Sequence, residues 1–448
     1  MKTRFLLPLL LLACFNGFAQ EAQLPSAALP QIPDNHVYLS EYGGAPDGIS
    51  SNTVAFRSAI EALSKQGGGH LHVGEGLYLT GPVRLKSRID LHLERGAVIL
   101  FSPDKREFVE KGKVLPCITA SKCHDVSISG EGIIDGNGEW WRAVKRGKVS
   151  DVEWKEFLKK GGTVSEDGSL WYPFGLKAYP DIADTDRGQE KMRTHLVRFT
   201  DCQRVAVSGV TLQNSPKFHL VPQRCTDVTI EGVTVRCPWN AQNGDGIDIM
   251  NSQRVVVSRC TVDVGDDGIC LKAGAGEKGL SDGPCKDILI ENNIVYHAHG
   301  GFVIGSEFSG GIVNVIVRHN TFSGTDTGLR FKSAPERGGM TSGLIISDIY
   351  MNDIKDEAIV FQTDYADRPA GYDDNQPAAS QRFLPDFTDI HMSRIFCRGC
   401  SVAIRARGPL TSIHDITLTD AAFFYTDAST DLSDPSMLHL SQVRFATY

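Results

Sequence analysis

The sequence predicts an all-β fold, a single-domain right-handed parallel β-helix (a solenoid) with an N-terminal capping helix. Three observations carry this prediction: an internal repeat, period-2 alternation of apolar residues inside each repeat, and 45 glycines among 448 residues. Repeats of about 20–50 residues are typical of solenoids, and short alternating runs are typical of strands. No helical pattern separates the runs, which favours a β-helix over a leucine-rich horseshoe.

The repeat is visible in ten segments that share one pattern. They are RIDLHLERGA (88–97), HDVSISGEGI (124–133), QRVAVSGVTL (203–212), TDVTIEGVTV (226–235), QRVVVSRCTV (253–262), KDILIENNIV (286–295), VNVIVRHNTF (313–322), SGLIISDIYM (342–351), TDIHMSRIFC (388–397) and HDITLTDAAF (414–423). Between positions 203 and 342 their starts are 23, 27, 33, 27 and 29 residues apart. Stacked coils of this kind lie about 4.8 Å apart through parallel pairing.

Both ends of a solenoid need covers, because an open end exposes strand edges. Residues 51–65 (SNTVAFRSAIEALSK) have helical spacing with Val54 on the apolar face and Asn52 or Thr53 as the N-cap, which predicts the N-terminal cap. Residues 136–196 interrupt the repeat with four of the five tryptophans, and we expect this insertion to wall one side of a cleft. Residues 364–385 are expected to form a rim loop.

The first residues are typical of a secretory signal peptide. Lys2 and Arg4 precede an apolar run at 5–13, and small residues follow before position 20. We therefore expect residues 1–19 to be removed and residues 20–448 to be exported, to the periplasm or the medium. Lipoprotein processing at Cys14 is a weaker alternative. The run is too short to span a bilayer, and no later stretch is apolar enough to do so.

The composition excludes two classes of protein. With 41% apolar and 22% charged residues, the chain is globular and not mainly disordered, and its net charge of −8 argues against a basic nucleic-acid binder. An exported protein can oxidise its cysteines. However, cysteines 202, 225, 237 and 260 lie inside strand patterns as small apolar fillers. The Cys397-x-x-Cys400 pair lacks a second pair at zinc-site spacing, so we expect it to be structural, with a local disulfide left open.

A further strand follows in each central coil. When these strands are aligned, the candidate catalytic and binding residues fall at matching positions. The five copies read DGIDIM (245–250), DGICLK (267–272), HGGFVI (299–304), TGLRFK (327–332) and EAIVFQ (357–362). Their apolar positions share one parity and are expected to point inward, so Lys272, Arg330 and Lys332 point outward. The first column then places Asp245, Asp267 and His299 on neighbouring coils, with Asp266 one position earlier.

Carboxylates gathered beside a basic pair suit the hydrolysis of a glycosidic bond. That reaction needs one carboxylic acid to protonate the leaving oxygen and a second carboxylate to act on water or on the sugar. Neighbouring like charges raise at least one pKa, and Arg330 with Lys332 can bind an anionic sugar. Each residue taken alone has an ordinary explanation. The aspartates could be turn residues, His299 a hydrogen-bonded structural residue, and Arg330 with Lys332 part of a solvated strand face. Their shared register favours a site, although Ca²⁺ binding by the three aspartates stays open.

These residues resemble glycoside hydrolase family 28, the polygalacturonases and related pectin hydrolases, in its bacterial type. The four signatures of that family occur in order as Asn243-Gly244-Asp245, Gly265-Asp266-Asp267, Ala298-His299-Gly300 and Arg330-Phe331-Lys332. Tyr365 matches a tyrosine of the family that contacts substrate. Three positions depart from the family pattern, since Gly244 replaces Thr, Ala298 replaces Gly and Phe331 replaces Ile.

The resemblance implies a secreted, inverting hydrolase of α-linked galacturonic acid in pectin, without a metal or cofactor. Its substrate would be an acidic pectic polysaccharide or oligogalacturonide, and we expect a monomer. The implied roles are Asp266 as general acid, Asp245 and Asp267 as the pair that activates water, His299 as the residue that tunes them, and Arg330, Lys332 and Tyr365 as ligands of galacturonate. Lys272 and His219 are expected to face outward beside the cluster as weaker candidates for substrate binding.

Two other functions and several details stay open at this point. A Ca²⁺-dependent, pectate-lyase-like β-elimination and a non-catalytic glycan-binding solenoid both fit the fold, but neither explains four ordered motifs. Inversion itself follows from the resemblance, because carboxylates about 5 Å apart would suggest retention and inversion needs about 6.5–9.5 Å. The sequence also leaves open whether cleavage is exo or endo, and whether Trp140, Trp141 and Trp171 stack on sugars or form a small core.

Overall fold

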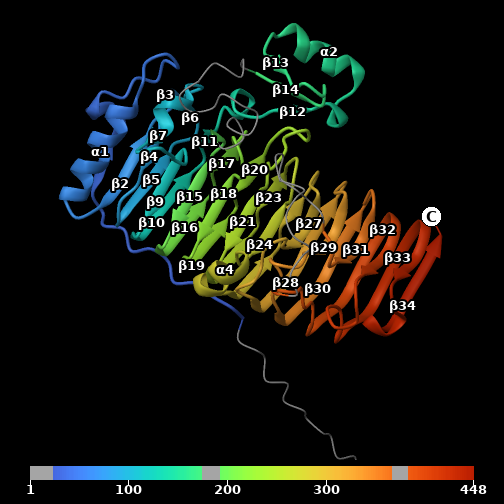
Figure 1. Ribbon diagram of the computed structural model, residues 1–448. Helices are drawn as coiled ribbons and strands as arrows, with labels where there is room; N and C mark the ends of the chain where they lie inside the picture. The colour runs from blue at the N-terminus through green and yellow to red at the C-terminus, as the bar shows by residue number, and fades with distance from the viewer. Residues whose placement is uncertain (1–23, 174–191, 366–381, 448) are drawn as a thin grey trace, which may run out of the picture.

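The computed structural model describes residues 24–173, 192–365 and 382–447. The expected signal peptide, including Cys14, lies outside these residues, as does most of the expected rim loop. The described chain winds into a right-handed parallel β-helix, as the repeat predicts (Figure 1). Among the helices of the described residues, none has the length and apolar character that crossing a membrane requires.

Each coil contributes strands to three parallel faces. The first face contains β1 (His36–Tyr38), β2 (Gly69–Val73), β5 (Ile89–Leu93), β10 (His124–Gly130), β16 (Gln203–Ser208), β19 (Thr226–Glu231), β22 (Gln253–Ser258), β25 (Cys285–Glu291) and the first halves of β28 (Ile312–Ser323), β30 (Thr341–Asn352), β32 (Ile390–Arg407) and β33 (Ile416–Leu432), ending at β34 (Leu438–Thr447). The second face contains β3 (Gly76–Thr80), β6 (Ala97–Phe101), β11 (Ile133–Asp135), β17 (Thr211–Gln213), β20 (Thr234–Arg236), β23 (Thr261–Asp263) and β26 (Ile294–Val295), continued by the later parts of β28, β30 and β32.

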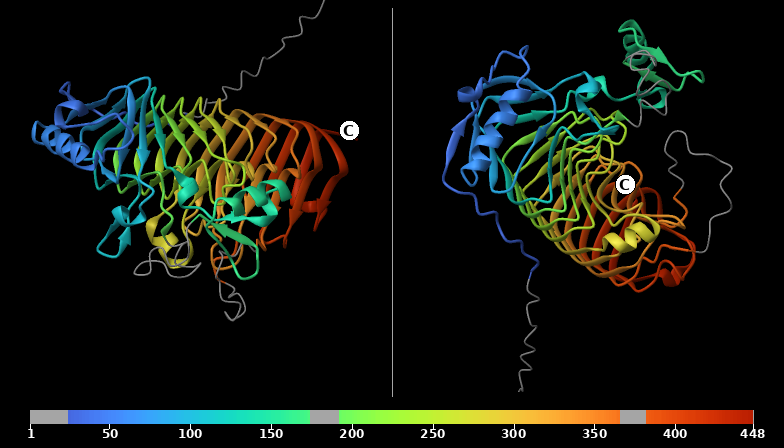
Figure 2. Two further views of the ribbon diagram at one scale, coloured as in Figure 1. Left: turned by 90° about the horizontal axis from the view of Figure 1, so that it is seen from above. Right: turned by 60° about the vertical axis from the view of Figure 1, so that its left-hand side comes forward.

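The third face carries the aligned strands that the sequence singles out. It contains β4 (Val83–Arg84), β9 (Ile118–Ser121), β15 (Val197–Thr200), β18 (Leu220–Gln223), β21 (Ile247–Met250), β24 (Ile269–Lys272), β27 (Gly300–Ile304), β29 (Thr327–Lys332), β31 (Glu357–Gln362) and the end of β32. Figure 2 shows these coils stacked along one axis. Residues far apart in sequence therefore become neighbours along this face.

Parallel, in-register stacking builds the core. Val205, Val228 and Val255 are successive partners on the first face, and all three are fully buried. Each inward side chain meets its equivalent on the next coil, so one apolar position repeated along the sequence becomes a continuous column. Burial of such columns is the main favourable contribution to folding, at about 25 cal/mol per Å² of apolar surface.

The N-terminal end is covered by α1 (Thr53–Lys65), as predicted (Figure 1). Its buried side chains are Ala55, Phe56, Ala59, Ile60 and Leu63. One detail of the prediction is wrong, because Val54 is exposed. Asn52 occupies the N-cap position, as predicted, but its side chain makes no bond to the first turn. Its amide instead hydrogen-bonds the backbone of Ala45 and Leu79, which ties the preceding loop to β3.

Segment 136–196 leaves the coil after β11 and returns at β15. Its described part contains η3 (Gly138–Trp140), β12 (Val144–Lys145), η4 (Arg146–Lys148), α2 (Asp151–Lys159), β13 (Thr163–Val164) and β14 (Leu170–Tyr172). These elements have a small core of their own, in which Trp171 packs with Val144, Val149 and Phe157. Trp141 is buried in the main core against Phe108, at 5.0 Å between ring centroids. Neither tryptophan is placed to stack on a sugar, whereas Trp140 is exposed.

The remaining elements are short additions between coils. Helix α4 (Gly276–Asp282) accounts for the longest spacing in the repeat, because it lies between the coils that start at 253 and 286. The others are η1 (Leu39–Tyr42), η2 (Lys105–Phe108), the antiparallel pair β7 (Val109–Glu110) and β8 (Lys113–Val114), and η5 (Pro435–Met437). All ten cysteines of the described chain are free thiols, so Cys397 and Cys400 form no disulfide here.

A ladder of opposite charges runs along the turns that begin the first-face strands. Arg204 makes a two-pronged ion pair with Asp125 at 2.6 and 2.7 Å, and Arg254 pairs with Asp227 at 2.8 and 2.9 Å. The segment before β1 runs along these turns (Figure 1), and the amide of Gln31 donates to Asp125 at 2.9 Å. The hydrogen bonds from Arg204 hold the pKa of Asp125 well below its ordinary value.

We expect Arg204→Ala to lower the free energy of unfolding by about 2 kcal/mol at pH 7, because the nearly buried Asp125 carboxylate loses both hydrogen bonds from the guanidinium and keeps only those from Gln31 and His124. The lowered pKa means that the pair stabilises the fold above the unfolded-state pKa and is lost as the pH falls. Denaturant unfolding of the full chain measures the change. Arg106→Ala, which disrupts an exposed pair with Asp104, should cost under about 1 kcal/mol. Equal losses in the two variants would contradict this account.

Candidate active site

The candidate site lies at the start of the third-face strands. Asp245 precedes β21, Asp266 and Asp267 precede β24, and His299 precedes β27. Parallel pairing sets Ile247 opposite Ile269, and so brings Asp245 level with Asp267 on the next coil. Alternation along β29 puts Arg330 and Lys332 on the outer side and buries Phe331 completely between them.

One expected register is wrong by a residue. The aligned columns place His299 opposite Asp267, but Phe302 pairs with Ile269, so His299 lies opposite Asp266. The backbone amide of His299 donates to the carbonyl of Asp266 at 2.9 Å. The cause is the double glycine at 300–301, which lets Phe302 rather than residue 301 take the inward position.

Asp266 is the carboxylate that faces the open side of the cluster, with a side chain 15% exposed. It accepts from the amides of Asn243 at 2.9 Å and Asp267 at 3.0 Å, and Nδ1 of His299 lies 3.1 Å from it. Burial opposes its ionisation, but the bond to His299 and the nearby positive charges outweigh burial and lower the pKa of Asp266. The free protein therefore holds Asp266 as a carboxylate.

Asp267 is almost fully buried among cations. Nζ of Lys332 lies 2.8 Å from its Oδ2, and Nη1 of Arg330 lies 3.6 Å from its Oδ1. Burial alone would raise the pKa of Asp267, yet Lys332 and Lys272 lower it overall. The ring of Tyr365 covers the same cations, with its centroid 4.9 Å from Nζ of Lys332 and 5.4 Å from the Arg330 guanidinium carbon. Cations and aromatic ring thus form one patch beside the carboxylates.

A deeper layer lies beneath this patch. Nζ of Lys272 lies 3.8 Å from Asp245, 3.5 Å from Asp248 and 3.9 Å from Asp267. Burial, and then the neighbouring aspartates, raise the pKa of Asp245 well above its ordinary value and that of Asp248 to about 7. Oδ1 of Asp245 and both oxygens of Asp248 have no hydrogen-bond partner among the described residues. Proton affinity within the cluster is therefore highest in this layer.

Two of the weaker candidates are buried instead of facing a ligand. His219 is fully buried, its Nε2 accepts from the amide of Ser215 at 3.2 Å, and its Nδ1 donates to the carbonyl of Asp245 at 2.8 Å. Burial lowers the pKa of His219 to about 4. Lys272 is only 6% exposed and donates to the carbonyl of Gly305 at 2.9 Å. Both residues hold the cluster in place through these bonds. His219 presents no accessible side chain to a sugar, and Lys272 is as deeply buried as Lys332.

Two residues of the cluster are missing from the sequence analysis. Asp248 has the outward parity within DGIDIM, so strand alternation could have found it. Lys148 could not have been found in this way, because it belongs to η4 in the interrupting segment. Its Nζ donates to the carbonyl of Gly265 at 3.1 Å and lies 3.1 Å from Nε2 of His299. Lys148, His299 and Asp266 therefore form a hydrogen-bonded chain.

The departure at Gly244 has a local cause in this chain. A Cβ atom at position 244 would lie 2.8 Å from Sγ of Cys237 and 2.9 Å from the carbonyl oxygen of Ala241. A threonine cannot be accommodated while Cys237 stands beside it. At Gly265 a Cβ would meet three backbone carbonyls within 2.8 Å, so the loop that holds Asp266 packs directly on residues 238–241.

The Asp266, Asp267 and His299 ligand atoms lie within 4.8 Å of one another, which a cation would also require. However, Asp267 already faces Lys332, Arg330 and Lys272, and Asp266 faces His299 with Lys148 behind it. A divalent cation would have to enter against these positive charges. The arrangement favours an anionic ligand over Ca²⁺.

Comparisons with known proteins agree with this geometry. Residues 148–379 match the family described as glycosyl hydrolases family 28. The exo-poly-alpha-D-galacturonosidase of Dickeya chrysanthemi is 29% identical over 401 residues, which cover 86% of this chain and 65% of that enzyme. The chain thus spans a little under two thirds of that relative. The endo-polygalacturonase of Pectobacterium carotovorum subsp. carotovorum is 25% identical over 387 residues, covering 85% and 84% of the two chains.

A solved structure is similar over nearly its whole length. The exopolygalacturonase of Thermotoga maritima superposes with a TM-score of 0.75 and 29% identity, covering 94% of each chain. The family match covers just over half of this chain and includes all four signatures and Tyr365. The protein therefore belongs to glycosyl hydrolases family 28.

Proposed function

We propose that the protein is an exported hydrolase of α-linked galacturonic acid in pectin and that it acts as a monomer. The observation that carries this proposal is the patch formed by Arg330, Lys332 and Tyr365 directly beside Asp266 and Asp267. A uronic acid offers a carboxylate to the cations and a sugar face to the aromatic ring. The names of the relatives from Dickeya and Pectobacterium support the same substrate class.

In the proposed reaction each carboxylate has a separate task. Asp266, the more accessible acid, donates a proton to the leaving glycosidic oxygen while Asp267, held ionised by Lys332, orients water. Asp245, in its ionised form, accepts the proton of that water, and burial with its acidic neighbours strengthens it as a base. Water then attacks the anomeric carbon from the side opposite the leaving oxygen, so the configuration inverts.

The lowered pKa of Asp266 has to be reversed before it can act as an acid. A galacturonate carboxylate bound at Arg330 and Lys332 would place a negative charge near Asp266 and draw those cations toward itself. Both effects raise the pKa of Asp266, so proton uptake accompanies substrate binding in this scheme. The rival lyase reaction would instead need an unprotonated Lys or Arg as base, whereas the aspartates around Lys272 raise its pKa well above its ordinary value in spite of burial.

We expect the mature protein to release new reducing ends from polygalacturonate without unsaturated, ultraviolet-absorbing products. Asp266→Asn should lower kcat by about 10²–10⁴-fold, because the amide has no acidic proton to deliver. The matched control Asp353→Asn, an exposed carboxylate on the equivalent turn three coils further along, should keep normal activity. Full activity in Asp266→Asn would overturn the assignment of the acid, and a Ca²⁺ requirement with unsaturated products would overturn hydrolysis. Tight glycan binding without any product would select a binding protein.

Lys148 acts in this scheme as a positioning residue through His299. Its positive charge stabilises ionised Asp266, so Lys148→Met should raise the pKa of Asp266. Because the acid must be protonated to react, activity falls as the pH rises through that pKa. The basic limb of the kcat profile, which reports the enzyme–substrate complex, should therefore move upward by about one pH unit, with Lys148→Arg remaining near the original profile. If Lys148→Met lost activity equally at every pH and the basic limb of the profile did not move, Lys148 would have only a structural role.

We further propose that the enzyme cuts from the end of its substrate. Lys148 brings the interrupting segment to within hydrogen-bond distance of His299, so this segment bounds the cleft at the catalytic residues themselves. The names of the Dickeya relative and the Thermotoga structure support exo action. Digestion of oligogalacturonides of defined length should yield one small product from the first time points. A random mixture of intermediate lengths at early times would show endo cleavage.

A further inference from the structure

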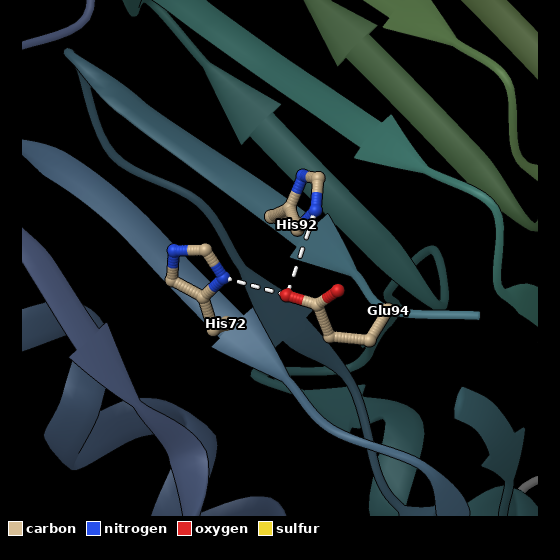
Figure 3. Close-up of side chains that lie close together, drawn as sticks. All are labelled: His72, His92 and Glu94. Atoms are coloured by element: carbon tan, nitrogen blue, oxygen red, sulfur yellow. Dashed lines mark hydrogen bonds and ion pairs between the residues drawn. The ribbon is translucent and has the colours of Figure 1, made fainter. Parts of the chain in front are cut away.

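A second cluster of titratable side chains lies far from the site described above, on the first face at the N-terminal end (Figure 3). His72 of β2 and His92 of β5 are direct partners in the parallel register, and Glu94 follows β5 immediately. Nδ1 of His72 lies 2.9 Å and Nε2 of His92 lies 3.7 Å from the same oxygen of Glu94. All three ligand atoms lie within 4.8 Å of one another.

The hydrogen bonds behind His92 fix its tautomer. The hydroxyl of Ser129 donates its single proton to Asp90 at 2.7 Å. Ser129 must therefore accept from Nδ1 of His92, which lies 2.8 Å away. A neutral His92 then carries its lone pair on Nε2, the nitrogen that faces Glu94.

A separate chain of hydrogen bonds leads to the same result for His72. The carboxylate of Asp34 can only accept, so it takes a proton from Nε2 of His36 at 3.0 Å. Neutral His36 then accepts at Nδ1 from Nε2 of His72, which lies 2.9 Å away. This leaves the lone pair of neutral His72 on Nδ1, again facing Glu94.

With both imidazoles neutral, two lone pairs and a carboxylate converge on one point with no hydrogen between them. Such an arrangement repels itself unless a positive charge lies at the centre. In a tetrahedral zinc site, bonds of about 2.0–2.1 Å place ligand atoms roughly 3.3 Å apart, close to the two separations from Glu94. We propose that His72, His92 and Glu94 bind a divalent transition-metal ion of the zinc class.

The chemistry of the donors selects the class of metal. Imidazole nitrogens suit zinc and its first-row neighbours, whereas Ca²⁺ and Mg²⁺ take oxygen ligands. Ser129 with Asp90 and His36 with Asp34 supply the outer hydrogen bonds that orient metal-binding histidines. Since Glu94 is 46% exposed, a water molecule can complete the tetrahedron.

The proposed site has a structural position in the fold. It joins β2 to β5 near the N-terminal end of the solenoid, where the short strand β1 and the helix α1 pack beyond β2. Because the ligands come from two coils, metal binding would strengthen the end at which an unprotected solenoid frays. The site shares no residue with the catalytic cluster on the third face, so its existence does not depend on the proposed substrate.

Metal titration of the full chain tests the proposal. The protein is purified without a polyhistidine tag, stripped with EDTA and titrated with Zn²⁺ by calorimetry and with Co²⁺ by absorption spectroscopy. We expect one Zn²⁺ per chain, a rise of several degrees in Tm, and the intense visible bands of tetrahedral Co²⁺. If His72 is simply protonated and paired with Glu94, no stoichiometric binding will be seen and the proposal fails.

Variants locate the bound metal. Glu94→Gln and His92→Gln should each weaken Zn²⁺ binding more than about 10-fold, and Ser129→Ala, which keeps every ligand, should weaken it about 10-fold. His391→Gln removes a comparable exposed histidine–carboxylate pair at the other end of the solenoid and should change nothing. His299→Gln tests the other cluster with suitable spacing. Binding that is lost in His299→Gln and kept in His92→Gln would overturn the assignment.

Discussion

In-register parallel stacking is the constraint on which the rest of this structure depends. Coils about 4.8 Å apart bring every residue beside its equivalent on the next coil. For apolar residues this produces the continuous core. For ionisable residues the same stacking brings like charges together. Asp245 and Asp267 on the third face are an example. In this fold, cations lie between the aspartates that stacking brings together.

The cations of the active site lie in two layers. Lys272 lies beneath, between Asp245, Asp248 and Asp267, while Lys332 and Arg330 lie above. The consequence is a division of proton affinity within one small volume. Burial dominates for Asp245 and Asp248 and raises their pKa, whereas cations dominate for Asp266 and Asp267 and lower it. A substrate that carries its own negative charge would change these pKa differences, because it competes with the aspartates for Lys332 and Arg330.

The fold could be predicted because local sequence patterns specify it. A period of 2 identifies the strands of each coil and their inward-facing side chains, and a period of 3.6 identifies the capping helix. The sequence also predicted which coils carry the acids and the outward positions of Arg330 and Lys332. It failed where the structure depends on something outside the pattern. The double glycine at 300–301 shifted His299 by one residue, and burial of His219 by its surroundings cannot be read from its parity. Lys148 comes from a segment with no repeat, so no alignment of coils could have placed it beside His299.

The same geometry limits how far such effects extend. In a solenoid each coil packs on its immediate neighbours, so stability is approximately a sum of nearest-neighbour terms. The charges around Asp266 come from His299 on the next coil, Lys332 on the coil after that and one inserted lysine, whereas the histidines of β2 and β5 belong to coils at the far N-terminal end. Substitutions that are well separated and share no partner are usually additive. The N-terminal cluster and the catalytic acids can therefore be altered one at a time, and a change seen in both would indicate a loss of stacking rather than a local effect.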